Sequence, residues 1–172
     1  GKTTFLKKYA EYLMDQGLHI GILENDFGAI NVDMLMLHEL RGDQCELEMI
    51  AGGCDAESHR RRFRTKLISM RMCGYDRVLV EPSGIYDVDE FFDVLREEPL
   101  DQWYEIGNVI AILDARLENN LSQQADYLLA SEAANAGKVI LSHADAATRE
   151  QCEDTVAHLL SLIHISEPTR LR

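Results

Sequence analysis

The sequence predicts an α/β fold built on a mostly parallel sheet that is covered by helices on both faces. Short apolar runs alternate along the chain with longer amphipathic segments, as expected for repeated strand–helix units. The runs at 77–80 and 138–141 are rich in Val, Ile and Leu, which is typical of strands buried on both faces. Ligands of such sheets bind at the carboxyl ends of the strands. Polar residues follow several of the runs, namely Asn25, Glu81, Asp114 and Ser142–Asp145.

The expected elements follow from local periodicity. The helix at 3–16 has an apolar stripe and ends at Gly17, and a strand follows at 19–24. A loop is expected at 25–33, a short helix at 34–41 and a strand at 45–50. The helices at 58–73 and 121–136 end at Gly74 and Gly137. The remaining elements are strands at 77–80, 108–113 and 138–141 and helices at 87–97 and 146–160.

Bulk properties narrow the class of protein. The length of 172 residues fits one domain, and 46% apolar residues suffice for a core. A net charge of −13 argues against nucleic acid as a partner, because phosphate binding needs a broad basic surface. No apolar stretch reaches the roughly 18–20 residues that a membrane-spanning helix needs. The four cysteines form no C-x-x-C pair, so we expect a reducing, cytoplasmic location.

The chain begins with Gly1-Lys2-Thr3-Thr4, which leads directly into the first amphipathic helix. These residues match the second half of the phosphate-binding motif G-x-x-x-x-G-K-[ST]. In that motif, backbone N–H groups hold the phosphates, the lysine supplies a positive charge and the hydroxyl after it coordinates Mg²⁺. The motif predicts a three-layer P-loop NTPase whose first strand is missing from this sequence. The alternative for these four residues is a chance helix start.

Two further segments carry carboxylates that such a site needs. Glu81 follows an apolar strand and is a candidate Mg²⁺ ligand, and the backbone amide of Gly84 is a candidate sensor of the γ-phosphate. Asp26 and Asp33, in the loop at 25–33, are candidates for positioning water or metal. The alternatives are an ordinary strand-end carboxylate at Glu81 and a surface turn with capping residues at 25–33.

Taken in order, these segments resemble a known family. The chain is similar to the metal-centre accessory GTPases of the CobW, HypB and UreG types in three segments. These are Gly1–Thr4, Asn-Asp-Phe-Gly-Ala-Ile-Asn-Val-Asp at 25–33 and Glu-Pro-Ser-Gly at 81–84. The resemblance covers about residues 1–145. It implies that Lys2, Thr3 and Glu81 bind GTP and Mg²⁺. It also implies that GTP hydrolysis is coupled to delivery of a metal ion or metal cofactor to a client metalloprotein.

The segment after the second strand departs from the CobW pattern. Gly52-Gly53-Cys54 keeps only the first cysteine of C-x-C-C, and it also resembles the Gly-Gly-Cys of UreG-type proteins, with His59 as the nearest histidine. Thiolate and imidazole ligands suit Zn²⁺ or Ni²⁺. Cys54 and His59 make half of a tetrahedral site, which a homodimer, Asp55 or Glu57 would complete. The alternative is a small Cys54 in a tight turn and a His59 on a helix surface.

The family's base-recognition motif is also altered. Where the family carries N-K-x-D after a strand, this chain has Ser142-His143-Ala144-Asp145. The resemblance implies base contacts at Ser142 and Asp145, with the carboxylate of Asp145 accepting hydrogen bonds from guanine. Without Asn and Lys, the preference for GTP over ATP stays open. The alternative for Asp145 is the N-cap of the helix at 146–160.

Other functions remain open on the sequence alone. A P-loop kinase or another ATP-dependent phosphotransferase fits the altered base motif, and a non-catalytic metal-binding module fits Cys54 and His59. The basic run at 59–66 is either a solvated helix face with acidic neighbours or a docking site for an acidic partner.

The domain boundaries that we expect are residues 1–159 for an incomplete GTPase domain and 160–172 for a non-native tail. Residues 160–170 match the translation of a transposase-type sequencing adapter, so His164 is not counted as a ligand. Because most of the phosphate-binding loop and the first strand are absent, we expect the chain as written to bind nucleotide poorly.

Overall fold

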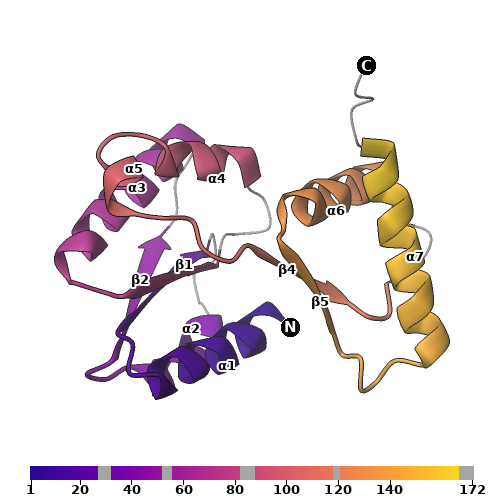
Figure 1. Cartoon of the computed structure of the whole chain (residues 1–172), viewed down its shortest axis with the longest axis horizontal. Coiled ribbons are helices and arrows are strands. Elements are labelled where there is room, and N and C mark those ends of the chain that lie inside the picture. The colour runs from indigo at the N-terminus through magenta and orange to yellow at the C-terminus, as the bar shows by residue number, and fades with distance from the viewer. Residues whose placement is uncertain (27–31, 52–55, 82–87, 118–120, 167–172) are drawn as a thin grey trace. The chain divides into compact units, whose positions relative to one another are not determined.

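A computed structural model describes residues 1–26, 32–51, 56–81, 88–117 and 121–166. At 25–26, 32–34, 51, 56, 88 and 164–166 it describes only the backbone. The chain divides into two compact units, Lys2–Glu105 and Ile106–Arg172, with Gly1 grouped with the second (Figure 1). We call these the N-terminal unit and the C-terminal unit and describe each by itself.

The N-terminal unit contains a parallel sheet of three strands in the order β2–β1–β3. The strands are β1 (Ile20–Asp26), β2 (Cys45–Ala51) and β3 (Arg77–Glu81). The helices are α1 (Lys2–Asp15), α2 (Val32–Leu37), α3 (Ala56–Met72), α4 (Val88–Leu95) and α5 (Leu100–Trp103), and a 3₁₀ turn, η1 (His38–Leu40), follows α2. The predicted α/β class with a mostly parallel sheet is confirmed.

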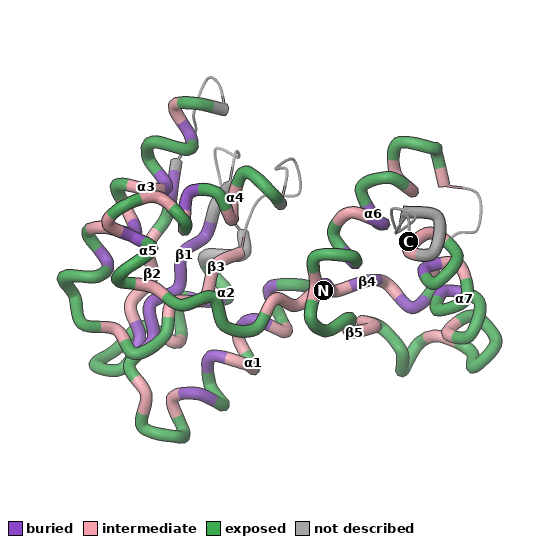
Figure 2. Tube along the Cα trace, turned by 45° about the horizontal axis from the view of Figure 1, so that its top comes forward, coloured by how far each residue is buried: buried purple, intermediate pink, exposed green. Residues whose placement is uncertain are grey.

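The central strand β1 is buried on both of its faces, because it separates two hydrophobic cores (Figure 2). Ile20 and Ile22 pack with Leu6, Ala10 and Leu13 of α1. Leu23, which points to the opposite face, packs with the second core, whose helical members are Phe63, Leu67 and Met70 of α3, Val94 of α4 and Leu100 of α5. Side chains of a strand alternate between the two faces, so the uninterrupted run Ile20–Leu23, which carries no polar side chain, is typical of a strand with helices on both sides.

The C-terminal unit is a parallel pair, β4 (Ile110–Asp114) and β5 (Lys138–Ser142), with two helices, α6 (Gln123–Asn135) and α7 (Arg149–Ser166). Leu113 packs with Leu129 and Ala133 of α6 and Leu159 of α7. Ser122 is the N-cap of α6, and its hydroxyl accepts a hydrogen bond from the N–H of Ala125 at 3.2 Å. The strands and helices of this unit follow the expected order.

The start of α7 differs from the expectation. The hydroxyl of Thr148 accepts a hydrogen bond from the N–H of Gln151 at 3.1 Å, and the side chain of Gln151 accepts one from the N–H of Thr148 at 2.9 Å. This reciprocal pair is a capping box. The alternative interpretation of Asp145 as the N-cap is therefore wrong, because the helix starts at Arg149.

Other boundaries shift for local reasons. Strand β1 continues to Asp26, and α2 begins at Val32, so Asp26 lies in a strand and Asp33 in a helix rather than in one continuous loop. Helix α5 was not expected, since four residues are too few to show a helical period. Helix α7 continues to Ser166, beyond the expected end at 160.

Gly21 of β1 is a position at which a side chain has no room. A Cβ placed there would lie 2.7 Å from Cε of Met70 and 2.7 Å from a ring carbon of Tyr75. We therefore expect Gly21→Ala to lower the free energy of unfolding by about 1–3 kcal/mol, the usual cost of overpacking a core. Urea denaturation measures this change.

Gly42→Ala is the matched control, because nothing lies within 4 Å of a Cβ at that position. Its effect should stay within about 1 kcal/mol of the wild type. Equal destabilisation by the two substitutions would contradict the close packing described for Gly21.

Candidate functional site

Two glutamates lie side by side at the carboxyl ends of neighbouring strands in the N-terminal unit. Glu24 of β1 and Glu81 of β3 are direct partners in the parallel register. Glu24 follows Ile22 by two residues, and Glu81 follows Leu79 by two. Ile22 belongs to the core between the sheet and α1, and Leu79 packs against that core. Because residues two apart on a strand share a face, both carboxylates lie on the α1 face of the sheet. Glu24 is only 3% exposed, and Glu81 is partly buried.

The start of α1 lies at the same end of the sheet. Gly17, with φ of 79°, ends α1, and the N–H of Leu18 donates to the carbonyl of Leu13, so the chain turns directly from α1 into β1. Helix α1 therefore runs antiparallel to β1. Fourteen helical residues and seven strand residues each span about 20 Å, so the N-terminus of α1 lies level with Glu24 and Asp26.

The phosphate-motif residues take different positions at this helix start. Thr3 is 8% exposed and lies on the stripe of α1 that faces the sheet, together with Leu6, Ala10 and Leu13. Gly1, Lys2 and Thr4 are exposed. Thr3 thus lies on the side of α1 that faces the sheet, and the carboxylates of Glu24 and Glu81 lie on the face of the sheet that α1 covers. Glu24 was missed by the sequence reasoning, because its pairing with Glu81 depends on strand register.

Four predicted site residues are described only by their backbone or lie outside the described residues. Gly84 and Cys54 fall outside the described residues. Asp26 ends β1 and Asp33 is the second residue of α2, but their side chains are not described. The backbone therefore places Asp26 at the same strand ends as Glu24 and Glu81.

His59, the predicted partner of Cys54, lies in the first turns of α3 and is 4% exposed. The alternative that His59 lies on a helix surface is wrong. Burial lowers the pKa of His59, and the positive charge of Arg62 lowers it further. Both effects favour the neutral imidazole, which is the form that binds metals. Among the described side chains, no group of three or more His, Cys, Asp or Glu residues is arranged to hold a metal ion.

The basic run on α3 is largely neutralised by neighbouring carboxylates. Arg60 and Arg64 both pair with Glu97, and the guanidinium of Arg64 also donates to the carbonyl of Glu98 at 2.7 Å. Lys66 pairs with Glu48 of β2 at 2.7 Å. Arg61 adds a pair with Glu57 one turn earlier on the same helix. The interpretation as a helix face with acidic neighbours is confirmed, and the ion pairs tie α3 to β2 and to the segment after α4.

A polar cluster lies at the carboxyl ends of β4 and β5 in the C-terminal unit. Asp114 and Ser142 are register partners, and the hydroxyl of Ser142 donates to the carbonyl of Leu113 at 3.0 Å. Asp114 accepts hydrogen bonds from the N–H of Arg116 at 2.9 Å and contacts Nδ1 of His143 at 2.9 Å. These contacts lower the pKa of Asp114 to about 2, and the largest effect is that of the hydrogen bond from the backbone N–H of Arg116. Asp145, two residues after His143, is exposed.

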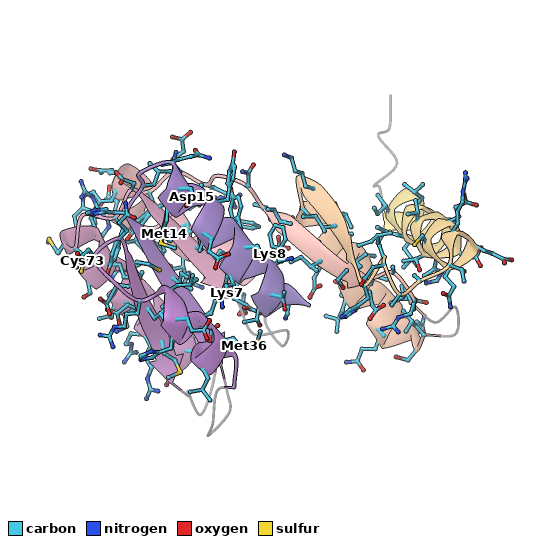
Figure 3. The ribbon with its side chains drawn as sticks, turned by 90° about the horizontal axis from the view of Figure 1, so that it is seen from below. Lys7, Lys8, Met14, Asp15, Met36 and Cys73 are labelled. Carbon is cyan, nitrogen blue, oxygen red and sulfur yellow. The ribbon has the colours of Figure 1, made fainter. Side chains whose placement is uncertain are left out.

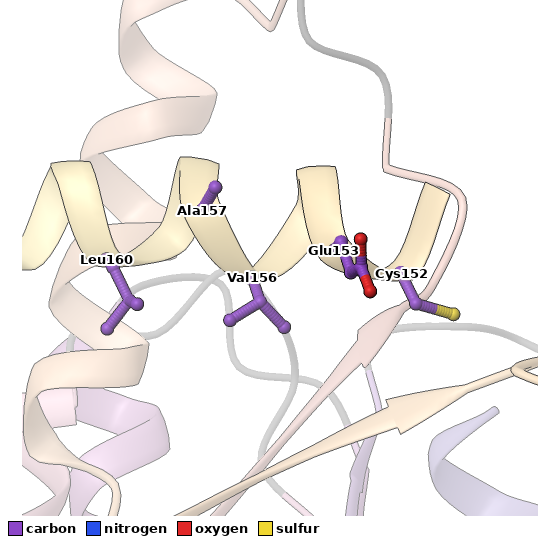
Figure 4. Close-up of a pocket in the computed structure, with 5 residues that line it drawn as sticks. All are labelled: Cys152, Glu153, Val156, Ala157 and Leu160. Carbon is purple, nitrogen blue, oxygen red and sulfur yellow. The ribbon is translucent and has the colours of Figure 1, made fainter. Parts of the chain in front are cut away.

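A shallow apolar groove of about 330 Å³ runs along α7 (Figure 4). It is lined by Cys152, Glu153, Val156, Ala157 and Leu160, none of which is a predicted site residue. No helix in the described part of the chain is long and apolar enough to cross a membrane.

Comparison with known proteins gives a family. The sequence profile described as "CobW/HypB/UreG, nucleotide-binding domain" matches residues 1–168. No solved structure matches the chain at a significant level.

Two curated relatives come from Escherichia coli (strain K12). Zinc chaperone YjiA is 28% identical over 160 residues, which cover 86% of this chain and 46% of the relative. Zinc chaperone YeiR is 24% identical over 151 residues, which cover 87% of this chain and 45% of the relative. The chain thus spans about half the length of these relatives. Since the profile matches nearly all of it, the chain belongs to the CobW/HypB/UreG family and corresponds to that family's nucleotide-binding domain.

Proposed function

We propose that the protein binds and hydrolyses GTP and couples hydrolysis to delivery of a metal ion or metal cofactor to a client metalloprotein. The observation that carries this proposal is the convergence of Thr3, Glu24 and Glu81 on the α1 face, level with the N-terminus of α1. Backbone N–H groups at a helix N-terminus attract phosphate, and Lys2 adds a full positive charge there. The family membership supports nucleotide binding at this position.

The chemistry of these residues fits Mg²⁺. Glu24 and Glu81 are neighbours across two paired strands that lie about 4.8 Å apart, so their carboxylates repel each other when both are ionised. A divalent cation offsets that repulsion, and carboxylate and hydroxyl oxygens are the ligands that Mg²⁺ prefers. Thr3 and Glu81 are the proposed ligands, with Glu24 beside them. Gly84 is the proposed γ-phosphate contact, and Asp26 and Asp33 are the proposed water-positioning carboxylates.

The remaining roles are assigned by the same resemblance. Ser142 and Asp145 are proposed to contact the base, and Cys54 and His59 are proposed to bind Zn²⁺ or Ni²⁺. The printed names of both relatives, zinc chaperones, favour Zn²⁺. A cytoplasmic location and a homodimer that completes the metal site also belong to this proposal, as do a GTPase domain at 1–159 and a non-native tail at 160–172.

Lys2→Ala in the full-length gene product is the first test. Loss of a charge-assisted contact to phosphate costs about 1.5–3 kcal/mol, so we expect binding of a fluorescent GTP analogue to weaken about 10- to 100-fold. Lys8→Ala is the matched control, since Lys8 is an exposed lysine farther along the same helix (Figure 3). Unchanged affinity and hydrolysis in Lys2→Ala would exclude the P-loop assignment.

Competition between GTP and ATP, with a search for a phosphorylated acceptor, separates the GTPase from a phosphotransferase.

Glu81→Gln tests the cation site separately from the phosphate site. The substitution keeps the shape of the side chain but removes a charge, so the Mg²⁺ concentration at half-maximal hydrolysis should rise at least about tenfold. Glu46→Gln removes a carboxylate on the opposite face of the sheet, where Glu46 pairs with Arg41, and should leave the Mg²⁺ dependence unchanged. Equal Mg²⁺ dependence in the wild type and Glu81→Gln would remove Glu81 from the site.

Zinc binding is tested by Cys54→Ser and His59→Gln. Each substitution removes one proposed ligand, so the Zn²⁺ affinity measured by competition with a chromophoric chelator should fall at least about tenfold. Cys73→Ser is the control, because Cys73 is an exposed free thiol directly after the C-terminal end of α3 (Figure 3). A Zn²⁺ affinity that falls only in Cys73→Ser would place the metal elsewhere.

A further inference from the structure

The carboxyl ends of β4 and β5 hold a histidine in a defined orientation. His143 follows β5 directly, and its Nδ1 lies 2.9 Å from Oδ2 of Asp114 at the end of β4. The other oxygen of Asp114 accepts from the backbone N–H of Arg116 at 2.9 Å, and Nε of Arg116 lies 3.4 Å from it. The carboxylate is thus fixed from both sides, and it fixes the imidazole in turn.

The backbone around His143 is equally constrained. His143 has φ of 58°, a left-handed conformation that residues other than glycine adopt rarely and at a cost. The turn is closed by a hydrogen bond from the N–H of Ala146 to the carbonyl of His143 at 3.1 Å. The N–H of Ala115 donates to the carbonyl of Ser142 at 2.9 Å, which joins the two strand ends. The side chain of His143 is 46% exposed, so this scaffold presents the ring to solvent.

The contact with Asp114 decides which ring nitrogen carries the proton. The pKa of Asp114 is held at about 2, so the carboxylate has no proton to donate at neutral pH. Nδ1 of His143 must therefore be the donor in this bond. In the neutral imidazole, Nε2 then has a free lone pair and acts as an acceptor.

We propose that His143 is a specificity-determining residue that accepts a hydrogen bond from an exocyclic amino group of the nucleobase through Nε2, with Asp114 as its positioning residue. This inference rests on the proposed function, in which the segment from Ser142 to Asp145 contacts the base. Asp145 is also an acceptor. The exposed ring of His143 and the carboxylate of Asp145 can therefore accept hydrogen bonds from amino groups on the base edge, but they offer no donor to its keto groups.

The experiment compares two pairs of nucleotides that differ by one amino group. GTP and ITP differ only in the 2-amino group, and ATP and purine riboside triphosphate differ only in the 6-amino group. In the full-length gene product, at least one of the two amino groups should tighten binding. The measured quantity is the dissociation constant of the nucleotide without the amino group divided by that of the nucleotide with it. His143→Ala should reduce this ratio by about three- to tenfold, the value of one lost hydrogen bond.

Asp114→Asn gives a result that a merely structural role does not. The amide of Asn can donate to Nδ1, which moves the ring proton to Nε2 and turns the acceptor into a donor. The preference for the amino-bearing nucleotide should then fall below that of His143→Ala. His143→Asn, which tolerates the left-handed backbone, provides a second variant in case the alanine variant does not fold. Arg149→Gln, on the exposed surface of α7, is the matched control.

The outcomes separate the two proposals. Two results for the His143 variants would overturn the role of His143 and leave the proposed function intact. In the first, the ratio of dissociation constants stays within about twofold of the wild-type ratio for both nucleotide pairs. In the second, the affinities for all four nucleotides fall equally. Failure of the wild type to bind any of the four nucleotides overturns both proposals. Wild-type binding that Lys2→Ala leaves unchanged overturns the P-loop assignment, whatever the ratios show.

Discussion

The pairing of β1 between β2 and β3 is the constraint on which the N-terminal unit depends. Its register sends Ile20, Ile22 and Glu24 to the α1 face and Leu23 to the α3 face. A slip of one residue would exchange these sets and bury the Glu24 carboxylate in the second core. The same register brings Glu24 next to Glu81. The packing of the cores and the position of the acidic pair are therefore consequences of one arrangement of strands.

Charge is distributed unevenly within this arrangement. The chain carries a net charge of −13. The basic run at 59–66 on α3 forms ion pairs with Glu97, Glu48 and Glu57. Ion pairs at exposed positions contribute little stability each, but here they also occupy side chains that would otherwise attract anions. The proposed phosphate site accordingly relies on Lys2 and on the backbone N–H groups at the start of α1.

Much of the fold was predictable, because a long helix such as α1 has a helical period and a buried strand such as β3 is a continuous apolar run. The stripe of α1 and the apolar run of β3 were located to within a residue or two. Helix α5 is shorter than two turns and leaves no periodic signal. The alternative interpretation of Asp145 as a helix cap is wrong, because Thr148 and Gln151 form a reciprocal pair that sets the start of α7. The alternative that placed His59 on the surface of its helix is also wrong: packing of α3 buries this side chain, and which face of a helix is buried depends on the elements that pack against it.

The sequence by itself determined the class of fold, the order of the motifs and the family, since all three depend on residue types and on spacings along the chain. Only the tertiary structure decided that Glu24 joins Glu81 and that Asp114 orients His143, 29 residues away. Such contacts depend on strand order and register. Those are set by how whole faces pack together, and local periodicity does not encode them.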